Sequence, residues 1–453
     1  MMYKRKAYDR LRQWKTESRG RTAMLIKGAR RVGKSMLAEE FGRSEYQKHL
    51  LVDFSTAPDE ILDLFRNGRN DIDTLLRYLF AYYGFVPIER ETLIIFDEVQ
   101  LCPQARASIK QLVADGRYDY IETGSLISIR ENIKDILIPS EERSLELHPF
   151  DFQEFLWAMG EEPLADIIAE SYRTLKPLPD ALHRKAERLF REYMLVGGMP
   201  QAIEAYVNGS FHAADEAKRD ILELYRNDIA RYGGMDSARV AAIFDAIPGQ
   251  LSKHEKKFRI SALGRNARRR QYESAFFWLA DAGLANLCFN STDPTVGLGL
   301  NLDQSAFKCY LADTGLLCTL AFSNNADTTE SVYRDVLFDK IGVNEGMLVE
   351  NVVAQQLRSA GHKLFFFSKT DSDTYANRLE IDFLLSSPYG NAAGRYRISP
   401  VEVKSGKRYS TSSLDKMRTL YGKRIGTEYV LHPKPLLVDG DRTYLPLYMS
   451  GLL

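Results

Sequence analysis

The residues with the clearest chemical spacing lie near the start of the chain, where Gly28 to Ser35 reads G-x-x-x-x-G-K-[ST]. In this pattern the loop amides cradle phosphate oxygens, and Gly33 lets the backbone approach them closely. Lys34 reaches the β and γ phosphates, and the Ser35 hydroxyl ligates Mg²⁺. The pattern predicts an ATP site made of Gly28, Ala29, Arg30, Arg31, Val32, Gly33, Lys34, Ser35 and Met36.

Two acids end a hydrophobic stretch about sixty residues later, in "ETLIIFDEVQ" (91–100). After a phosphate-binding loop, this Walker B form predicts that Asp97 holds Mg²⁺ and that Glu98 orients or deprotonates the attacking water. The two motifs together predict a hydrolase of nucleoside triphosphates.

A third stretch, "YIETGSLISI" (120–129), is predicted to be the next strand. Thr123 and Ser125 lie at its end, where a polar side chain can touch both the γ-phosphate and the attacking water. This is the sensor-1 role, and a plain turn at a strand end is the alternative interpretation.

Charged residues in the last quarter of the chain suggest a second site. "SPVEVKSG" (399–406) predicts a strand whose alternation puts Glu402 and Lys404 on one face. Asp382 lies on the strand before it, and Glu350 lies on or beside the buried face of a helix over 346–361. Since a buried carboxylate requires a cation or a hydrogen-bond network, these residues predict one wall of a metal site. A charged edge strand is the alternative.

The elements that must position these residues follow in a regular order. Residues 22–42 read as strand, loop and helix, and residues 143–157 as a fifth strand and an aromatic turn. Residues 166–235 read as helices with a Gly-Gly break. Three short helices and a β segment then run from 236 to about 290, and the rest of the chain reads as α-β-β-β-α-β.

The chain resembles the AAA+ ATPases of a bacterial and archaeal family that carry a C-terminal restriction-endonuclease-like domain. The matching segments are "KGARRVGKS", "LIIFDEVQ", "TGS", "LHPFDFQEFL", "YMLVGGMP", "YLADTGLL", "GMLVENVVAQQL", "EIDFLL" and "VEVKSG". The resemblance implies an α/β fold in which a P-loop AAA+ core is followed by a helical lid, a winged helix and an α/β restriction-endonuclease-like domain. It implies the domain boundaries 1–165, 166–235, 236–325 and 326–453.

The resemblance also implies roles for individual residues. Arg143, just before the fifth strand, would act as a finger in trans within a homo-oligomer, although the family more often has Gly where this chain has Glu142. In PD-(D/E)xK enzymes the acids corresponding to Asp382 and Glu402 hold Mg²⁺, and the lysine corresponding to Lys404 activates water or stabilises the developing charge. A helix acid such as Glu350 often completes that metal site.

A winged helix commonly inserts its third helix into the major groove of DNA. Arginines that could bind phosphate stand near the start of that predicted helix: Arg265, Arg268, Arg269 and Arg270. A solvated helix end is the alternative interpretation of these charges.

Composition limits the remaining choices. The chain has 453 residues with 61 basic and 61 acidic side chains, so a nucleic-acid surface would have to be local. No apolar run is long enough to span a bilayer, and the basic start lacks the apolar region of a signal peptide. Four scattered cysteines without a C-x-x-C pair indicate a reducing cytoplasm and no zinc site.

The sequence therefore predicts an ATP-hydrolysing protein that acts on DNA and has a metal-dependent, nuclease-like C-terminal domain. Two alternatives remain open at this level. One is a nucleotide-gated switch whose nuclease-like domain grips DNA without cutting it, and the other is an ATPase that recognises a partner protein.

Overall fold

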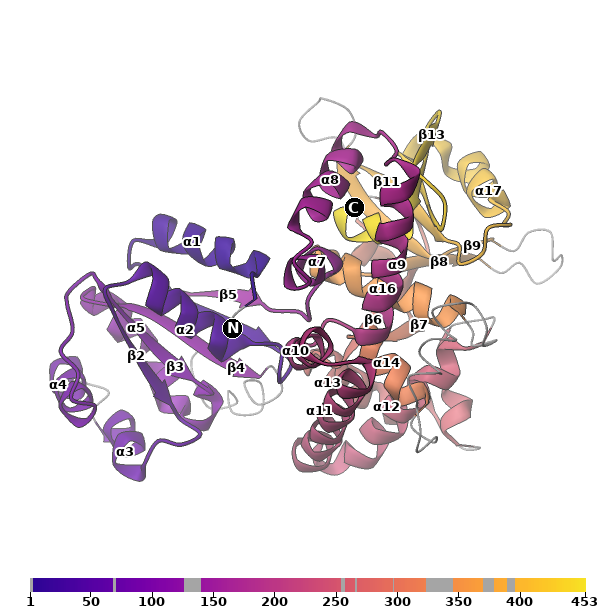
Figure 1. Cartoon of the computed structure of the whole chain (residues 1–453). Coiled ribbons are helices and arrows are strands. Elements are labelled where there is room, and N and C mark those ends of the chain that lie inside the picture. The colour runs from indigo at the N-terminus through magenta and orange to yellow at the C-terminus, as the bar shows by residue number, and fades with distance from the viewer. Residues whose placement is uncertain are drawn as a thin grey trace. The chain divides into compact units, whose positions relative to one another are not determined.

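The computed structural model describes residues 3–67, 71–125, 140–253, 257–264, 267–295, 297–322, 345–369, 379–388 and 396–453. The chain folds into two compact units (Figure 1). The first comprises Met1–His148 with Asp281–Gly283, and the second comprises Pro149–Ala280 with Leu284–Leu453.

A five-stranded sheet forms the centre of the first unit, with all strand pairs parallel and the order β2-β3-β4-β1-β5. The strands are β1 (Ala23–Gly28), β2 (Lys48–Asp53), β3 (Thr92–Asp97), β4 (Asp119–Ser125) and β5 (Glu142–Glu146). The helices are α1 (Lys6–Ser18), α2 (Lys34–Glu45), α3 (Asp59–Asn67), α4 (Ile72–Tyr82) and α5 (Pro103–Asp115), with a short 3-10 helix η1 (Val99–Leu101). Because all strands run the same way, their carboxyl ends share one edge of the sheet.

Strands β3 and β4 are inner strands of this sheet, and β3 is apolar over nearly its whole length. Every residue of β3 and of β4 is buried, as expected for parallel strands covered on both faces. The rings of Phe54, Phe65 and Phe96 pack against one another, with centroids 5.4–5.8 Å apart. This packing holds the ends of β3 and β4 in place, and those ends carry the polar residues of the predicted site.

The second unit contains most of the helices. They are α7 (Phe152–Ala158), α8 (Glu162–Thr174), α9 (Asp180–Val196), α10 (Pro200–Asn208), α11 (Phe211–Tyr232), α12 (Ser237–Leu251), α13 (Arg269–Asp281), α14 (Thr314–Ala321), α16 (Glu345–Ser359) and α17 (Ser412–Tyr421). Short 3-10 helices in the described ranges of this unit are η2 (Gly234–Asp236), η3 (Ile260–Leu263), η4 (Leu298–Asn301), η6 (Gly422–Arg424) and η7 (Leu447–Leu452). The second of the three short helices predicted after residue 236 is thus reduced to η3, which ends before Gly264.

Two sheets complete the second unit, with strand orders β7-β6-β8-β9 and β10-β11-β12-β14-β13. Their strands are β6 (Ala285–Ser291), β7 (Leu302–Leu311), β8 (Phe365–Lys369), β9 (Leu379–Ile381), β10 (Phe383–Pro388), β11 (Tyr396–Val403), β12 (Glu428–His432), β13 (Leu437–Asp439) and β14 (Arg442–Pro446). After α16, the predicted second strand is interrupted at Asp382 and forms β9 and β10, which belong to different sheets, whereas the other predicted elements are present as β8, β11, α17 and β12. A short hairpin of β13 and β14 extends this order.

Strand pairing crosses one of the predicted domain boundaries. Strand β6, from the predicted winged helix, pairs with β7 in antiparallel orientation and with β8, from the C-terminal segment, in parallel orientation. The predicted lid is also attached to the chain's end, since His183 of α9 and the Tyr448 hydroxyl share a hydrogen bond of 2.9 Å. These contacts join the three segments into one compact unit, and their division into separate domains stays a prediction.

The Gly-Gly break after α9 has a packing reason. Gly197 has a φ of 84°, and a side chain there would collide with the carboxylate of Asp313. The Gly198 amide donates a 2.5 Å hydrogen bond to the same carboxylate, which also caps α14 by accepting from the Leu316 amide. The motif therefore lets the end of α9 approach α14 closely.

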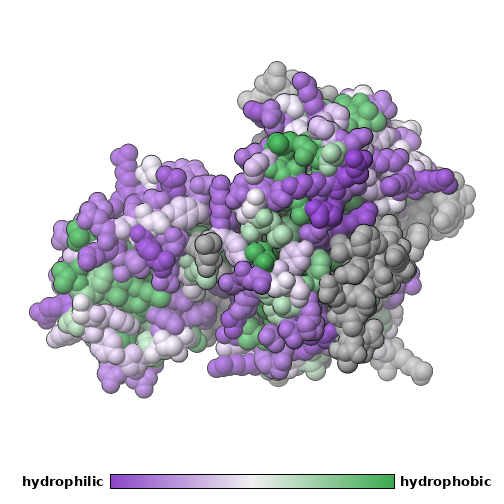
Figure 2. Space-filling view, in the orientation of Figure 1, coloured by the Kyte–Doolittle hydropathy of each residue, from purple (hydrophilic) through white to green (hydrophobic). Residues whose placement is uncertain are grey.

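The visible surface in Figure 2 is mainly hydrophilic, with separate hydrophobic patches between the hydrophilic areas. None of the helices in the described ranges is both long and apolar enough to cross a membrane.

Candidate functional site

The predicted phosphate-binding loop joins the end of β1 to the start of α2. Gly33 has a φ of 94° and Arg31 a φ of 67°, so the loop turns sharply just before the helix. A side chain at Gly28 would collide with the Leu147 carbonyl oxygen. The loop therefore presents backbone amides and the amino end of α2 to one point, which is the arrangement that binds anions.

Lys34 is the first residue of α2, and its side chain is buried against this loop. Its ammonium donates hydrogen bonds to the carbonyl oxygens of Gly28 and Ala29, at 3.2 and 3.0 Å. These bonds hold the ammonium at the loop where β and γ phosphates would lie. Met36, the last residue of the predicted site, is 58% exposed on the same helix.

The Walker A and Walker B motifs meet at Asp97. The Ser35 hydroxyl donates a 2.7 Å hydrogen bond to Asp97 Oδ1, and the Thr123 hydroxyl donates to the same oxygen. A serine hydroxyl and a carboxylate are the hard oxygen donors that Mg²⁺ prefers, so Ser35 and Asp97 fit that ion. Ser125 is paired in register with Gly28 and is also buried at this edge of the sheet.

Glu98 follows Asp97 with a φ of 51°, a conformation that turns it out of the strand direction. Its amide donates to the Thr123 hydroxyl at 3.4 Å, and its carboxylate accepts a hydrogen bond from the Gln100 side chain. Gln100 is buried, and its hydrogen bond restrains the side chain of Glu98, the predicted catalytic acid. The sequence analysis assigned no role to Gln100, although it lies within the motif "LIIFDEVQ".

Arg143 lies away from the nucleotide site of its own chain. Strand pairing places it beside Met24, near the amino end of β1, whereas the loop begins at Gly28. Four residues of strand separate these points, which is roughly 13 Å. The Arg143 guanidinium is half exposed and pairs with Glu17 of α1 at 3.1 Å. Any role of Arg143 in hydrolysis would have to be exerted on a neighbouring subunit, and that role stays a prediction.

Glu142, which departs from the family pattern, has a structural partner. Arg106 donates to both of its carboxylate oxygens, at 3.0 and 3.1 Å. The carboxyl group of Glu122, fully buried on β4, lies beside it. Burial and the neighbouring Glu142 carboxylate raise the pKa of Glu122 well above its ordinary value. Glu142 therefore belongs to a buried Arg–Glu–Glu group inside the sheet layer.

The predicted DNA-binding arginines stand at the start of α13, except Arg265, which lies outside the described residues. Arg268 and Arg270 are exposed. Arg269 instead places its guanidinium 5.7 Å from the centre of the Phe307 ring. Two of the four arginines are thus available on the surface, and one packs on the β6–β7 hairpin.

The C-terminal carboxylates are brought close together, but around a lysine that the sequence analysis did not select. Lys308 of β7 is buried, and its ammonium lies 3.0 Å from Glu350, 3.4 Å from Glu380 and 3.7 Å from Asp382. The Tyr310 hydroxyl also donates to Glu350. Burial lowers the pKa of Lys308, but the three carboxylates outweigh this effect and raise it above its ordinary value.

Glu402 and Lys404 form a pair of their own, and their side chains are joined as an ion pair. Asp382 approaches this strand through its second oxygen, which accepts a 2.9 Å hydrogen bond from the Val403 amide. Burial and the negative charge of Asp382 raise the pKa of Glu402.

These contacts bear on the predicted metal set, which stays a prediction. Within the described ranges, no three or more His, Cys, Asp or Glu side chains form a group that could hold a metal ion. The expected ligands Glu350, Asp382 and Glu402 are divided between two lysines, Lys308 and Lys404. Each lysine offsets part of the negative charge at its own position.

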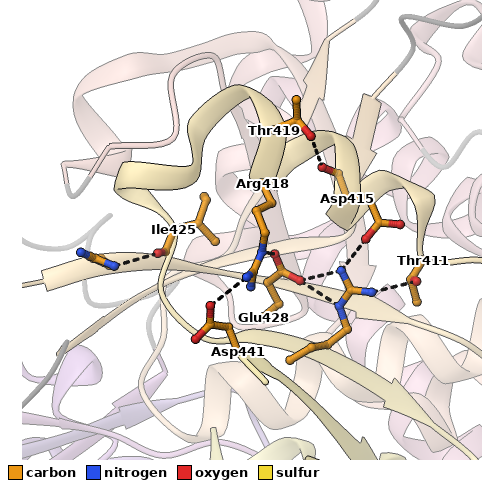
Figure 3. Close-up of polar contacts among 9 residues, drawn as sticks. Thr411, Asp415, Arg418, Thr419, Ile425, Glu428 and Asp441 are labelled. Atoms are coloured by element: carbon orange, nitrogen blue, oxygen red, sulfur yellow. Dashed lines mark hydrogen bonds and ion pairs between the residues drawn. The ribbon is translucent and has the colours of Figure 1, made fainter. Parts of the chain in front are cut away.

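Another charged cluster lies farther along the C-terminal segment (Figure 3). The fully buried Glu428 of β12 accepts from Arg418 of α17 at 2.6 Å and from Arg442 of β14 at 2.8 Å. Arg418 also pairs with Asp441 and Arg442 with Asp415, at 2.8 and 2.7 Å. These ion pairs join α17 to β12 and β14, and we interpret them as stabilising the fold.

Three family models match separate parts of the chain. Residues 20–156 match an AAA domain, residues 187–328 match a domain of unknown function (DUF8612), and residues 345–448 match another (DUF4143). No curated protein matches the chain.

Among solved structures, a chain in the structure of Drosophila ORC bound to DNA is 14% identical. The match covers 67% of this chain and 91% of that one. Its TM-score of 0.23 is too low to support any argument about fold or function. The amino-terminal part of the chain therefore carries an AAA domain, and its matched range contains the whole predicted nucleotide site.

Proposed function

We propose that this protein binds and hydrolyses ATP at the site between β1, β3 and β4. The observation that carries the proposal is the shared contact of Ser35 and Thr123 with Asp97, which joins three separate motifs at one carboxylate oxygen. Lys34 and the loop amides bind the phosphates, and Thr123 contacts the γ-phosphate or the attacking water. Mg²⁺, held by Ser35 and Asp97, would neutralise charge between the β and γ phosphates.

Glu98 orients the attacking water and accepts its proton. Its position one residue after Asp97 places it beside the metal ligand, and Gln100 restrains its carboxylate. Hydrolysis by this arrangement requires little covalent chemistry from the protein, since positioning and charge stabilisation supply most of the rate.

The test separates binding from turnover. Lys34→Ala should abolish nucleotide binding, whereas Glu98→Gln should keep binding and lose hydrolysis. Binding is measured with a fluorescent ATP analogue, and turnover is measured as released phosphate. Parent-like hydrolysis by the Lys34→Ala variant would remove the proposal.

We further propose that the protein is a homo-oligomer in the cytoplasm and that DNA is its macromolecular partner. Helices α12 and α13 followed by the β6–β7 hairpin have the element order of a winged helix, and the exposed Arg268 and Arg270 support DNA contact at α13. The four cysteines are free and buried, which supports a reducing compartment.

For the C-terminal segment we propose a PD-(D/E)xK-like fold that binds DNA without cutting it. Support for the fold comes from Asp382, which directly precedes β10, and Glu402 on the neighbouring strand β11. Support for the absence of cleavage comes from Lys308, whose ammonium lies 3.7 Å from Asp382. Incubation with ATP, Mg²⁺ or Mn²⁺ and branched, linear or single-stranded DNA tests this. Metal-dependent cuts that vanish in Asp382→Ala would instead support a nuclease.

A further inference from the structure

One feature of the second unit has no role in ATP hydrolysis or in DNA contact at α13: a fully buried ammonium among three carboxylates. The carboxylates come from different segments, since Glu350 lies on α16, Glu380 on β9 and Asp382 between β9 and β10. Lys308 Nζ lies 3.0, 3.4 and 3.7 Å from their nearest oxygens. The ammonium is therefore the point on which these three acids converge.

The position of this ammonium is set by a strand. Lys308 and Tyr310 are two residues apart on β7, so their side chains share one face, and both contact Glu350. Lys308 is paired in register with Cys288 of β6, within the longest strand pairing of that sheet. Its ammonium also lies 5.1 Å from the centre of the Phe366 ring on β8. A lysine held by a sheet in this way stays at the centre of the cluster.

A divalent cation would compete with Lys308 for the same oxygens and the same space. Mg²⁺ takes oxygen ligands at about 2.0–2.1 Å in a nearly octahedral arrangement. The ammonium already donates to Glu350 at hydrogen-bond distance, and Asp382 uses its second oxygen for the Val403 amide. Placing an ion among these oxygens would also bring two positive groups close together in a buried site, which is unfavourable.

We propose that Lys308 occupies the position of the divalent cation and acts as a resident counter-ion that closes the Glu350–Glu380–Asp382 cluster to metals. The ammonium then offsets part of the negative charge of the three acids, and the C-terminal segment keeps these acids without binding Mg²⁺. Removing the ammonium should convert the same three carboxylates into a metal site. This inference deepens the proposed non-cleaving function, on which it rests for its biological meaning, but it is tested by metal binding alone.

The experiment uses the full chain without nucleotide and with Asp97→Asn, so that the nucleotide site does not contribute. Mn²⁺ binding is followed by calorimetry and by the metal-dependent rise of the melting temperature. The parent should show no saturable site. Lys308→Met, which keeps the length of the side chain without its charge, should gain one site, and adding Asp382→Asn should remove it.

Two controls make the outcome specific. Lys218→Met removes another fully buried ammonium, which donates to the Leu195 carbonyl, and should gain no site. Lys308→Gln serves as a second variant if Lys308→Met fails to fold, and circular dichroism checks both. Saturable Mn²⁺ binding by the parent that is lost with Asp382→Asn would overturn the proposal, as would a folded Lys308 variant that gains no site.

The Mn²⁺-binding experiment and the DNA-binding experiment can give independent results, so failure of one proposal can be distinguished from failure of the other. Parent protein that binds no Mn²⁺ at this cluster but also no DNA would leave the counter-ion role standing and remove the proposed DNA-binding function. If the parent protein binds Mn²⁺ at the Glu350–Glu380–Asp382 cluster and cuts DNA, both the counter-ion role of Lys308 and the proposed non-cleaving function are wrong.

Discussion

Ser35 and Asp97 lie 62 residues apart in the chain, and their side chains are joined by a hydrogen bond of 2.7 Å. The first belongs to the start of α2 and the second to the end of β3, and parallel pairing through β4 brings both elements to the same edge of the sheet. Thr123 from β4 completes the group by donating to the same carboxylate. One carboxylate oxygen of Asp97, the predicted Mg²⁺ ligand, therefore links Ser35 of the phosphate-binding loop to Thr123, the predicted sensor residue.

Gln100 is expected to be a positioning residue for Glu98. Gln100→Ala removes the hydrogen bond to the Glu98 carboxylate, so turnover should fall by roughly tenfold, a part of the ~10²–10⁴ that a positioned base supplies. ATP affinity should stay unchanged while the maximal rate of turnover falls. Gln13→Ala, on the exposed face of α1, is the control. Equal loss of binding and turnover would indicate a structural role only.

Arg143 is expected to act across a subunit interface. Its distance from the loop of its own chain means that Arg143→Ala should lower turnover only in oligomers, by up to ~10³–10⁵. Turnover per subunit should rise with protein concentration in the parent. Mixing Arg143→Ala with Lys34→Ala should restore activity, because one subunit then supplies the arginine and the other the intact loop.

The loss of the Arg143–Glu17 ion pair needs its own control. Glu17→Ala removes the same pair and should keep full turnover. A turnover that does not depend on concentration, from a protein that stays monomeric, would exclude the interface role.

Arg268 and Arg270 are expected to contact DNA phosphates. The double variant Arg268→Ala/Arg270→Ala should weaken DNA binding. The plot of the logarithm of the DNA association constant against the logarithm of the salt concentration should become less steep by about 2, one for each lost phosphate contact. Fluorescence anisotropy at several salt concentrations measures this slope. Arg188→Ala, on an exposed part of α9, should leave it unchanged. A slope equal to that of the parent would place the DNA contact elsewhere.

Glu122 should make the protein more stable in mild acid than at higher pH, relative to a glutamine variant. Its raised folded-state pKa means that its stabilising contribution is present below the unfolded value of about 4.3 and is lost as pH rises through the folded value. Glu122→Gln removes this dependence. The free energy of unfolding of the variant should therefore exceed that of the parent increasingly from pH ~4 upward, by at most ~1.4 kcal/mol per pH unit.

Denaturant unfolding at several pH values measures this difference. The exposed Glu60→Gln on α3 serves as the control and should show no pH-dependent difference. A Glu122→Gln variant that loses stability relative to the parent as pH rises would show that Glu122 is needed as an anion.

Glu428 is expected to be a stability residue. Glu428→Ala leaves Arg418 and Arg442 without their shared buried partner, so the free energy of unfolding should fall by about 2–4 kcal/mol (Figure 3). Asp441→Ala removes a largely exposed partner of Arg418 and should cost less than about 1 kcal/mol. Urea unfolding compares the two. ATP turnover of the folded Glu428→Ala protein should equal that of the parent, and a selective loss of turnover would contradict the purely structural role.

The candidate nucleotide site could be predicted from the sequence because its motifs depend on the spacing of residues within short segments. A phosphate-binding loop is a continuous segment, and an acid at the end of an apolar strand can be recognised without knowing what packs on it. Ser35 and Thr123 both contact Asp97, and Lys34 contacts the adjoining loop, while their roles at a nucleotide stay predictions. The alternation that placed Glu402 and Lys404 on one face of a strand is likewise a local property, and the two side chains form an ion pair.

Lys308, the partner of Glu350, Glu380 and Asp382, could not be predicted from local spacing. The sequence predicts that a buried Glu350 needs a cation or a hydrogen-bond network, but it leaves open which one. Lys308 lies 42 residues before Glu350, in a segment assigned to a different domain. The packing of α16 on β7 and the pairing of β6 with both β7 and β8 bring it to the acids. Sequence spacing describes chemistry along one segment, whereas charge compensation in a core depends on which segments pack together, and that is decided by the tertiary structure.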